Sequence, residues 1–434
     1  MPSSAESLFR NRLGADAVVT GDAVYRYAAA GAVPGCVLEP RTVEQVIAAV
    51  DSARAAGLAL VAAGHGTHLE IGWPPRRYDA AISMRCLDRI AAHDAADMTV
   101  TVAGGVTLGA LRSALAESRQ WLPLDPARGD EMTVGGLIAA DRSGPLRFAY
   151  GKVREWLLGL TVVSGEGTLV RGGGRVVKNV AGYDLPKLFA GSFGTLGAIV
   201  EATFKVRPLP EHEALFVWPA PSLPVALDAA MGVLGSPVLP VLLEVINDAA
   251  AESLGLGDGA CVVLGCAGSA AHVDEQEQRL RARSGDAAQR FDDERGRALR
   301  RALSDFSQPA NDEAVVARVS ALPSVAATLL AELERAASER HVVAEVAAHA
   351  GNGVAWCQLL GAPSALVLAE LTAWLRTRAR QHGAWVVFEA LPAELRDRVD
   401  PWGFDQPALR LMRGVKQAFD PAGVFSPGRF VGGI

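Results

Sequence analysis

The sequence predicts an α+β protein with more than one domain, and three observations lead to this prediction. Its 434 residues are more than one hydrophobic core usually supports, so two or three domains are expected. Several predicted strands in the first half run directly into glycine-rich loops. In the second half, short apolar strands alternate with amphipathic helices, and some strands follow one another directly. This last pattern is typical of an antiparallel sheet with helices on one face.

Composition and charge exclude several classes of function. Half of the residues are hydrophobic and 21% are charged, which is typical of a soluble globular protein. The net charge of −6 offers no basic face, so we expect no binding to nucleic acid. No apolar run reaches the roughly 18 residues of a membrane helix, and the first residues lack the core of a signal peptide. The five cysteines are scattered without CxxC spacing, which indicates a reducing cytoplasm and no iron–sulfur ligands.

The first elements lead to a glycine-rich loop. Residues 1–34 are a polar lead-in with one weak helix, and a short strand follows at 35–38. A helix is predicted over 43–56, with Thr42 as N-cap and Gly57 at its end. The next strand, 58–62, runs straight into Ala63-Gly64-His65-Gly66-Thr67-His68.

This loop has the composition of an anion cradle. Small residues let consecutive N–H groups converge on a phosphate, and glycine supplies the positive φ that such a turn requires. An ordinary hairpin loop is the alternative. The GxGxxG and GxxxxGK[ST] phosphate motifs are absent, which argues against NAD-type and P-loop sites. His65 and His68 are three residues apart, but only Glu70 lies nearby, so no metal site is expected.

A second glycine motif follows further along the chain. Strands are predicted at 80–84 and 98–103, and a helix capped by Thr107 at 108–117. The residues Thr133-Val134-Gly135-Gly136 stand where another helix should begin, and a helix start offers free N–H groups to an anion. After a loop with Gly144, strands are predicted at 157–164 and 168–171.

A third glycine motif lies within residues 175–208. The stretch opens with alternating apolar residues, turns at 182–184 and reaches Gly191-Ser192-Phe193-Gly194-Thr195-Leu196-Gly197 before a strand at 198–206. Three glycines at three-residue spacing suit a backbone that lies close to something bulky. A glycine-rich turn between a helix and a strand is the alternative.

The second half predicts the antiparallel sheet and its helices. The expected strands are 215–218, 239–246, 260–266, 314–320, 342–349, 354–360 and 384–390. The expected helices are 222–234, 270–283, 295–306, 323–339 and 363–381. Residues 281–297 are expected to form a surface excursion, and the tail to hold a helix at 406–419.

The order of these motifs resembles one family. The motifs are the 63–68 loop, VTLGAL (106–111), LPLDP (122–126), TVGGLIA (133–139), Tyr-Gly (150–151), VVKNVAGYDLPKLFAGSFGTLG (176–197), IVEATFKVRPLPE (199–211) and FDPAGVFSPGR (419–429). Together they look like the FAD-binding oxidases of the vanillyl-alcohol-oxidase/PCMH superfamily. Within it the chain is most similar to the FAD-binding subunit of bacterial glycolate oxidase (the GlcE type) and to D-lactate dehydrogenase relatives.

The resemblance implies a division of the chain and a set of cofactor contacts. It implies a two-subdomain PCMH-type FAD-binding domain at 35–210, an α+β cap or substrate domain at 211–392, and a segment at 393–434 that returns to the FAD-binding domain. The residues that would hold FAD are Ala63, Gly64, His65, Gly66, Thr67, His68, Pro126, Thr133, Gly135, Gly136, Ser143, Gly144, Gly197 and Ile199.

The chain departs from the family pattern at two places in this domain. Ala63, Gly64 and His65 stand where the family often has Arg-Gly-Gly, so a phosphate-side arginine is missing. Thr67 stands where members that tether the flavin covalently carry histidine, so we expect non-covalent FAD. Phe193 replaces a glutamate that is common in catalytic relatives, which matches the accessory subunit better.

A third departure concerns the predicted cap. Relatives that oxidise 2-hydroxy acids carry H-x-G-D-G-N-x-H, whose two histidines bind a divalent metal. Here His349 and both glycines remain, but the second histidine is absent and Asn352 replaces the aspartate. One imidazole is too few ligands for a stable site, so no metal is expected.

Four residues are candidates for catalysis, although the base is not identified. Arg318 stands mid-strand among apolar residues and needs an anionic partner, either a substrate carboxylate or an internal ion pair. Arg147, Trp402 and His349 are the others, with Lys178 and Tyr183 as lesser candidates.

The sequence therefore predicts an FAD-dependent oxidoreductase that acts on CH–OH donors. The first hypothesis is a component that passes hydride from a small 2-hydroxy acid to flavin and electrons to partner subunits, which would be a catalytic flavoprotein and an iron–sulfur protein. It would be cytoplasmic, or peripheral to the inner membrane through these partners. The alternatives are a non-catalytic or electron-relay flavin subunit and a stand-alone FAD oxidase of another alcohol.

Overall fold

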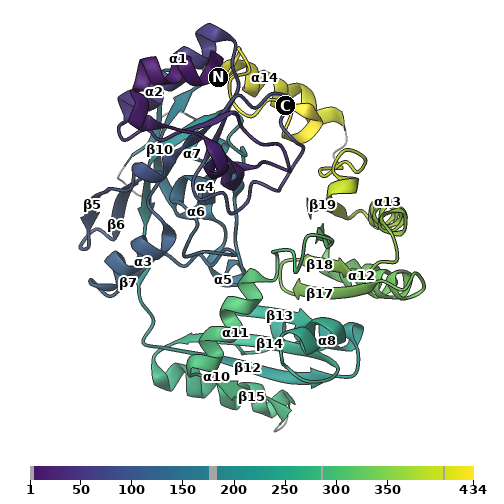
Figure 1. The fold of residues 1–434 in the computed structure, drawn as a ribbon. Helices are drawn as coiled ribbons and strands as arrows, with labels where there is room; N and C mark the ends of the chain where they lie inside the picture. The colour runs from purple at the N-terminus through teal and green to yellow at the C-terminus, as the bar shows by residue number, and fades with distance from the viewer. Residues whose placement is uncertain (1–3, 175–182, 285–286, 404–405) are drawn as a thin grey trace.

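The computed structural model describes residues 4–174, 183–284, 287–403 and 406–434 (Figure 1). The strand expected at the start of the 175–208 stretch, with Lys178, lies outside these residues. Two sheets and their helices form the N-terminal part, and an eight-stranded sheet forms the second part. The antiparallel sheet domain and the mixed α and β first part match the predicted fold class.

The first sheet has the strand order β1-β2-β4-β3. Its strands are β1 (Val18–Val19), β2 (Cys36–Leu38), β3 (Leu60–Ala63) and β4 (Ala80–Ser83). Strands β2 and β3 both pair with β4 in parallel, as expected for strands joined through helix α2 (Val43–Ala56). Thr42 caps α2 and Gly57 ends it in the left-handed conformation, as the sequence predicted. The lead-in also contributes to this part, because helix α1 (Ser4–Leu13) buries Phe9 in the same core.

The second sheet is antiparallel, with the order β5-β6-β10-β8-β9. Its strands are β5 (Ile90–Asp94), β6 (Thr99–Ala103), β8 (Leu157–Ser164), β9 (Leu169–Gly173) and β10 (Gly197–Lys205). The central strand β10 separates two cores: Ala198 and Val200 pack toward the first sheet, whereas Ile199 and Phe204 pack against α3 (Leu108–Ala116) and α4 (Val134–Ala140). This alternation accounts for the nearly continuous apolar run of the strand.

Several short elements connect these sheets. They are the helices α5 (Arg147–Tyr150), α6 (Val153–Trp156) and α7 (Leu185–Phe189), the strands β7 (Gln120–Trp121) and β11 (Arg207–Pro208), and the 3₁₀ turns Ala15–Ala17, Gly21–Tyr27 and Met84–Cys86.

The eight-stranded sheet is antiparallel throughout, with the order β15-β12-β14-β13-β17-β18-β16-β19. Its strands are β12 (His212–Ala220), β13 (Leu242–Ile246), β14 (Ala260–Gly268), β15 (Gln289–Phe291), β16 (Val315–Ser320), β17 (Val343–His349), β18 (Val354–Leu360) and β19 (Trp385–Ala390). All seven strands expected in this half are present.

Helices cover one face of this sheet with a large apolar core (Figure 1). These helices are α8 (Leu223–Leu234), α10 (Ala270–Ser284), α12 (Pro323–Ser338) and α13 (Ala365–Gln381). The opposite face packs on α9 (Asp248–Ser253) and α11 (Glu294–Asp305) and turns toward the N-terminal part. This second face therefore meets the predicted cofactor loops.

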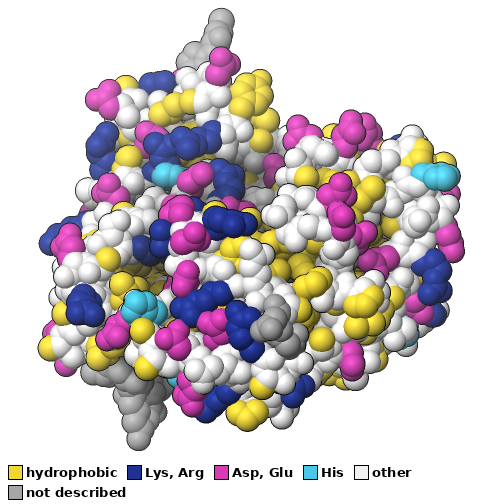
Figure 2. Space-filling view, turned by 90° about the horizontal axis from the view of Figure 1, so that it is seen from below, with side chains coloured by type: hydrophobic (Ala, Val, Ile, Leu, Met, Phe, Trp, Pro, Cys, Tyr) yellow, Lys and Arg dark blue, Asp and Glu magenta, His cyan; other side chains and the backbone are white. Residues whose placement is uncertain are grey.

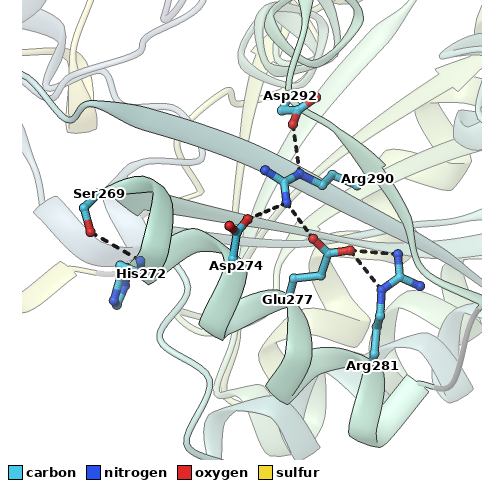
Figure 3. A network of polar contacts seen from close by, with 7 residues as sticks. All are labelled: Ser269, His272, Asp274, Glu277, Arg281, Arg290 and Asp292. Carbon is cyan, nitrogen blue, oxygen red and sulfur yellow. Dashed lines mark hydrogen bonds and ion pairs between the residues drawn. The ribbon is translucent and has the colours of Figure 1, made fainter.

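Residues 281–297, expected as a surface excursion, include an edge strand. Arg290 of β15 donates to Asp274 and Glu277 of α10 and to Asp292, and Glu277 also accepts from Arg281 (Figure 3). These ion pairs link α10 to β15, which pairs with the edge of β12. Acidic and basic side chains are interspersed on the face seen from below (Figure 2).

The C-terminal segment lies beside the first sheet. After α14 (Leu409–Phe419), the N–H of Leu60 in β3 donates to the Val424 carbonyl, and the N–H of Ser426 donates to the Leu60 carbonyl. The Lys416 ammonium fixes this segment, because it donates to Asp420 at 2.6 Å and to the carbonyls of Thr195 and Phe425. The remaining 3₁₀ turns are Ala393–Leu395, Gln406–Ala408 and Val431–Gly433. None of the described helices is long and apolar enough to cross a bilayer.

We predict that Lys416→Met destabilises the fold by about 3 kcal/mol, because it leaves the buried Asp420 carboxylate without its cation. The measurement is chemical unfolding. The control is Lys187→Met, whose pair with Asp184 is exposed and contributes at most about 1 kcal/mol. Equal losses in the two variants would show that the Lys416 contacts do not hold the segment.

Candidate functional site

Two glycine-bearing segments that are far apart in the sequence meet at the end of β3. A Cβ atom placed on Gly64 would lie 2.0 Å from Thr133 Oγ1, so only glycine allows the approach. Both residues line a narrow cleft, here called the glycine cleft, which also includes Ala63, Gly135, Gly136, Gly194, Gly197 and Ile199. The structure thus brings together three of the glycine motifs.

The loop after β3 carries a row of backbone donors. Among the described residues, none accepts a hydrogen bond from the amide N–H groups of Gly64 through His68. Gly66 has φ +77°, the left-handed conformation that turns successive N–H groups toward one side. Consecutive amides without acceptors beside a cleft are the arrangement that binds phosphate oxygens.

The start of helix α4 differs from the expectation. Thr133 caps the helix as predicted, but the first amides are already used within the protein. Val134 N–H donates to the Val106 carbonyl, Gly135 N–H to the Gly104 carbonyl, and Gly136 N–H to Thr133 Oγ1. Here these residues close the cleft wall, because their glycines let strands β6 and β10 lie close by. The amides that remain available to an anion are therefore those of the 64–68 loop.

This arrangement fits a dinucleotide. The cleft is lined by backbone and small side chains that exclude a bulky residue, and the free amides lie at its β3 end. Burial lowers the pKa of both His65 and His68, so neither ring carries a charge near neutral pH. His68 Nδ1 lies 3.0 Å from the Thr67 hydroxyl.

A second pocket lies at the other end of α4, here called the cationic pocket. Its charged lining residues are Arg142, Arg147, Lys152, Arg318, Asp141 and Glu389, which is four cations against two carboxylates. It has a cavity volume of about 220 Å³ and lies between the 140–152 segment and the face of the eight-stranded sheet that turns toward it. The positive excess suits an anion.

A buried carboxylate organises this pocket. Glu389 Oε1 accepts from Arg142 Nη1 at 2.7 Å and from Arg318 Nε at 2.8 Å, while Oε2 accepts from Trp356 Nε1 at 3.0 Å. Burial disfavours the ionised carboxyl, but the two guanidinium groups outweigh it and lower its pKa to about 2. Glu389 therefore stays ionised and joins the N-terminal part to the sheet.

Arg318 makes the internal ion pair that was one of its two expected roles. Its Nε takes the internal ion pair with Glu389, and its side chain remains partly exposed and lines the pocket. Arg147 lines the same pocket, where burial and then the charge of Arg318 lower its pKa. Lys152 pairs with Asp141 Oδ2 at 2.6 Å, whereas Asp141 Oδ1 is buried without a hydrogen-bond partner among the described residues.

Aromatic residues form the other side of the pocket. Phe193 lies 4.9 Å from Trp402 and 5.5 Å from Phe430, measured between ring centroids. The Trp402 indole N–H donates to the Arg429 carbonyl, so this ring is fixed. Phe193 has φ +52° and its N–H donates to the Ala139 carbonyl, which anchors the 191–197 loop on α4.

His349 lies outside the cationic pocket. Its Nδ1 contacts the buried carboxylate of Glu244, and its ring packs edge-on against Trp356. No cluster of three or more metal-ligating side chains occurs in the described part of the chain. The nearby Asp125 is fully enclosed, and burial raises its pKa to about 6 although the Leu146 amide opposes the shift.

The remaining predicted residues are divided between different places. Ser143 lines the cationic pocket. Gly144 packs on Asp125, to which its N–H donates. Pro126 lines a separate hollow with Arg112 and Arg300, away from both sites described above.

Sequence reasoning missed four residues of these sites. They are Asp141, Arg142, Lys152 and Glu389, which meet through contacts between residues up to 247 positions apart. One signal could have identified Glu389: like Arg318, it is a charged residue within an otherwise apolar strand. Ser426 was a fifth: its buried hydroxyl has no hydrogen-bond partner within the described ranges and lies beside Gly194 of the cleft.

We predict that Gly64→Ala lowers FAD affinity by at least about tenfold, because the new methyl group pushes the 64–68 loop away from Thr133. The measurement is the flavin that acid releases from the purified protein into the supernatant. The control is Gly414→Ala in α14, which meets open space. Full occupancy in Gly64→Ala would contradict the assignment of the cleft, and wild-type flavin that stays with the precipitate would contradict non-covalent binding.

We predict that Glu389→Gln costs about 3 kcal/mol of unfolding free energy at pH 7, because Arg142 and Arg318 lose their shared anion. The pKa of Glu389 is lower in the folded state than in the unfolded chain. Its contribution to the unfolding free energy is therefore complete above the pKa of the unfolded chain and declines as the pH falls toward about 2. Unfolding of the wild type and the variant is measured at pH 7 and near pH 3. The difference in unfolding free energy near pH 3 should be about half of its value at pH 7. A difference that does not depend on pH would contradict this.

Comparison with known proteins agrees with this geometry. Residues 34–173 match the family described as FAD binding domain, and residues 401–430 match the family described as FAD linked oxidases, C-terminal domain. A probable mitochondrial D-lactate dehydrogenase of Danio rerio is 29% identical over 431 residues, covering 91% of this chain and 84% of the relative.

Other relatives match over shorter stretches. A D-2-hydroxyglutarate dehydrogenase of Xanthomonas citri is 35% identical over 194 residues, which is 45% of this chain and 41% of the relative. Glycolate oxidase subunit GlcE of Escherichia coli is 40% identical over 130 residues, which is 30% of this chain and 37% of the relative. The chain is thus similar to GlcE only in part.

The fold also occurs among solved structures. The crystal structure of p-cresol methylhydroxylase with substrate bound superposes with a TM-score of 0.77 and 17% identity, covering 98% of this chain and 96% of that one. The matched families, the glycine cleft and its free amides lead to one conclusion: the chain carries an FAD-binding domain at residues 34–173 and a C-terminal segment of the FAD-linked oxidases at residues 401–430.

Proposed function

We propose that this protein is an FAD-dependent dehydrogenase that oxidises a 2-hydroxy acid to the 2-oxo acid. The observation that carries the proposal is the cationic pocket, which opens at the end of α4 opposite the glycine cleft. The seven residues of α4 span about 10 Å, which suits a cofactor with its phosphates at one end and its ring system at the other. The named relatives, which include D-lactate and D-2-hydroxyglutarate dehydrogenases, support the substrate class.

The pocket supplies the groups that such an acid needs. Arg318 uses Nε for Glu389, and its terminal nitrogens are the donors for a substrate carboxylate. Arg147 adds a second positive charge at the same wall. Glu389 fixes the direction of the Arg318 guanidinium, which reduces the entropy lost when the acid binds.

Asp141 is the residue that we assign to the substrate hydroxyl proton. Its Oδ2 is held by Lys152, while Oδ1 is buried and has no partner among the described residues. Both Glu389 oxygens, in contrast, already accept from Arg142, Arg318 and Trp356. Bound FAD supplies the hydride acceptor for this oxidation.

A second candidate is an FAD-bearing subunit that works with a catalytic flavoprotein and an iron–sulfur protein. The 40% identity to GlcE and the incomplete histidine motif at 349–353 favour it. The two functions differ in what the chain does alone. Turnover of a 2-hydroxy acid by the purified chain with an artificial electron acceptor would exclude a purely structural or relay role.

We predict that D-2-hydroxy acids bleach the flavin absorbance of the purified protein under anaerobic conditions, and that Asp141→Asn slows this at least about 100-fold, because the proton acceptor is lost. The measurement is stopped-flow absorbance. The control is Asp397→Asn, which changes an exposed carboxylate without a role in the pocket. If no 2-hydroxy acid bleaches the wild-type flavin, the proposed activity is wrong; if Asp141→Asn reacts normally, only the role of Asp141 is wrong.

A further inference from the structure

Beside its charged residues, the cationic pocket has an apolar side. Its lining includes Ile71, Phe193, Val387, Trp402, Phe430 and Val431, all members of one apolar cluster. Two further tryptophans, Trp356 and Trp385, face the same space. The carboxylate, hydroxyl and α-carbon of a hydroxy acid would occupy only the charged end of the pocket.

Strand register fixes where this apolar surface lies relative to the carboxylate site. Arg318 of β16 is directly opposite Val387 of β19 on one side and Trp356 of β18 on the other. Directly opposed side chains in antiparallel strands lie on the same face, with Cβ atoms about 5 Å apart. A carboxylate held by Arg318 therefore has apolar side chains on both flanks.

Along strand β19, the side chains on the pocket face change from charged to apolar. Glu389, Val387 and Trp385 alternate onto the pocket face, and each step of two residues advances about 7 Å. Glu389 is buried among the arginines, Val387 packs with Trp402 and Phe193, and Trp385 is 39% exposed at the outer end. The side chain of a bound acid would follow this direction.

The apolar wall is rigid. The Trp402 indole is tied to the Arg429 carbonyl, and the Trp356 indole is tied to Glu389. Phe430 stacks on Phe193 and meets Trp402 edge-on at 5.0 Å. Rings that are fixed before binding lose little entropy when they contact a ligand.

From this geometry we propose that the substrate is a 2-hydroxy acid with a large apolar substituent, best an aryl group one carbon from the hydroxyl-bearing carbon. This rests on the proposed function and specifies its substrate. The aryl ring packs against Val387, Trp402 and Phe430 while Arg318 binds the carboxylate. A second carboxylate would be disfavoured there, because the apolar members of the wall offer no cation to pair with it.

The test compares D-3-phenyllactate, D-lactate, glycolate and D-malate as reductants of the flavin in the purified holoprotein. We expect kcat/KM for D-3-phenyllactate to exceed that for each of the others at least about tenfold. A preference for D-lactate, glycolate or D-malate would overturn the inference and leave the proposed function intact. Failure of all four acids would instead overturn the proposed function, and the inference with it.

Binding provides a readout that does not depend on turnover. Phenylpyruvate and pyruvate, the corresponding 2-oxo acids, can be titrated while the fluorescence of the pocket tryptophans is followed. We expect phenylpyruvate to bind at least about tenfold more tightly than pyruvate. Equal affinities would contradict the inference.

Two variants locate the effect. Val387→Phe fills the wall beside Arg318 and should abolish the preference for D-3-phenyllactate over D-lactate. Trp385→Ala, at the partly exposed end of β19, does not depend on a buried packing change and should reduce the preference several-fold. Unchanged preference in folded Val387→Phe, or in Trp385→Ala, would place the aryl site elsewhere and contradict the proposal.

Discussion

A buried carboxylate joins the two halves of this protein. Glu389 belongs to the edge strand of the eight-stranded sheet, whereas Arg142 belongs to the loop that follows α4 in the N-terminal part. Removing these charges from water is costly, and the cost is offset only because Arg142, Arg318 and Trp356 all donate to the same carboxylate. The position of the sheet relative to α4, and thus the pocket between them, depends on this contact.

The glycine cleft depends on close backbone approach instead of on charge. Gly64 can lie against Thr133 because it has no side chain, and the amides that follow Gly64 are left without acceptors in the protein. The C-terminal segment completes this region by pairing with Leu60 of β3, and Lys416 ties it to the 191–197 loop through the Thr195 carbonyl. Residues from four separate stretches of the chain thus surround one binding site for the cofactor.

The charged side chains that the eight-stranded sheet contributes to the cationic pocket gather at a distance from His349. His349 faces the N-terminal part, but its ring is engaged by Glu244 and Trp356. The charged side chains that line the cationic pocket are arginines, a lysine and carboxylates, and those of the sheet lie at its β19 edge. Glu389 fixes the guanidinium of Arg318, and this is the arrangement on which the proposed carboxylate site rests.

The sequence by itself determined the local elements and the family. Local pattern depends on neighbours within a few residues: apolar periodicity, the helix N-caps Thr42, Thr107 and Thr133, and the positions of the glycines. The helices α2 and α3 and the strands of the eight-stranded sheet follow from it. Only the tertiary structure decided that Gly64 meets Thr133, that the α4 amides are used internally, and that Glu389 is the anion beside Arg318. These contacts join residues far apart in the chain, and their geometry is fixed by strand register and domain packing, which local pattern does not encode.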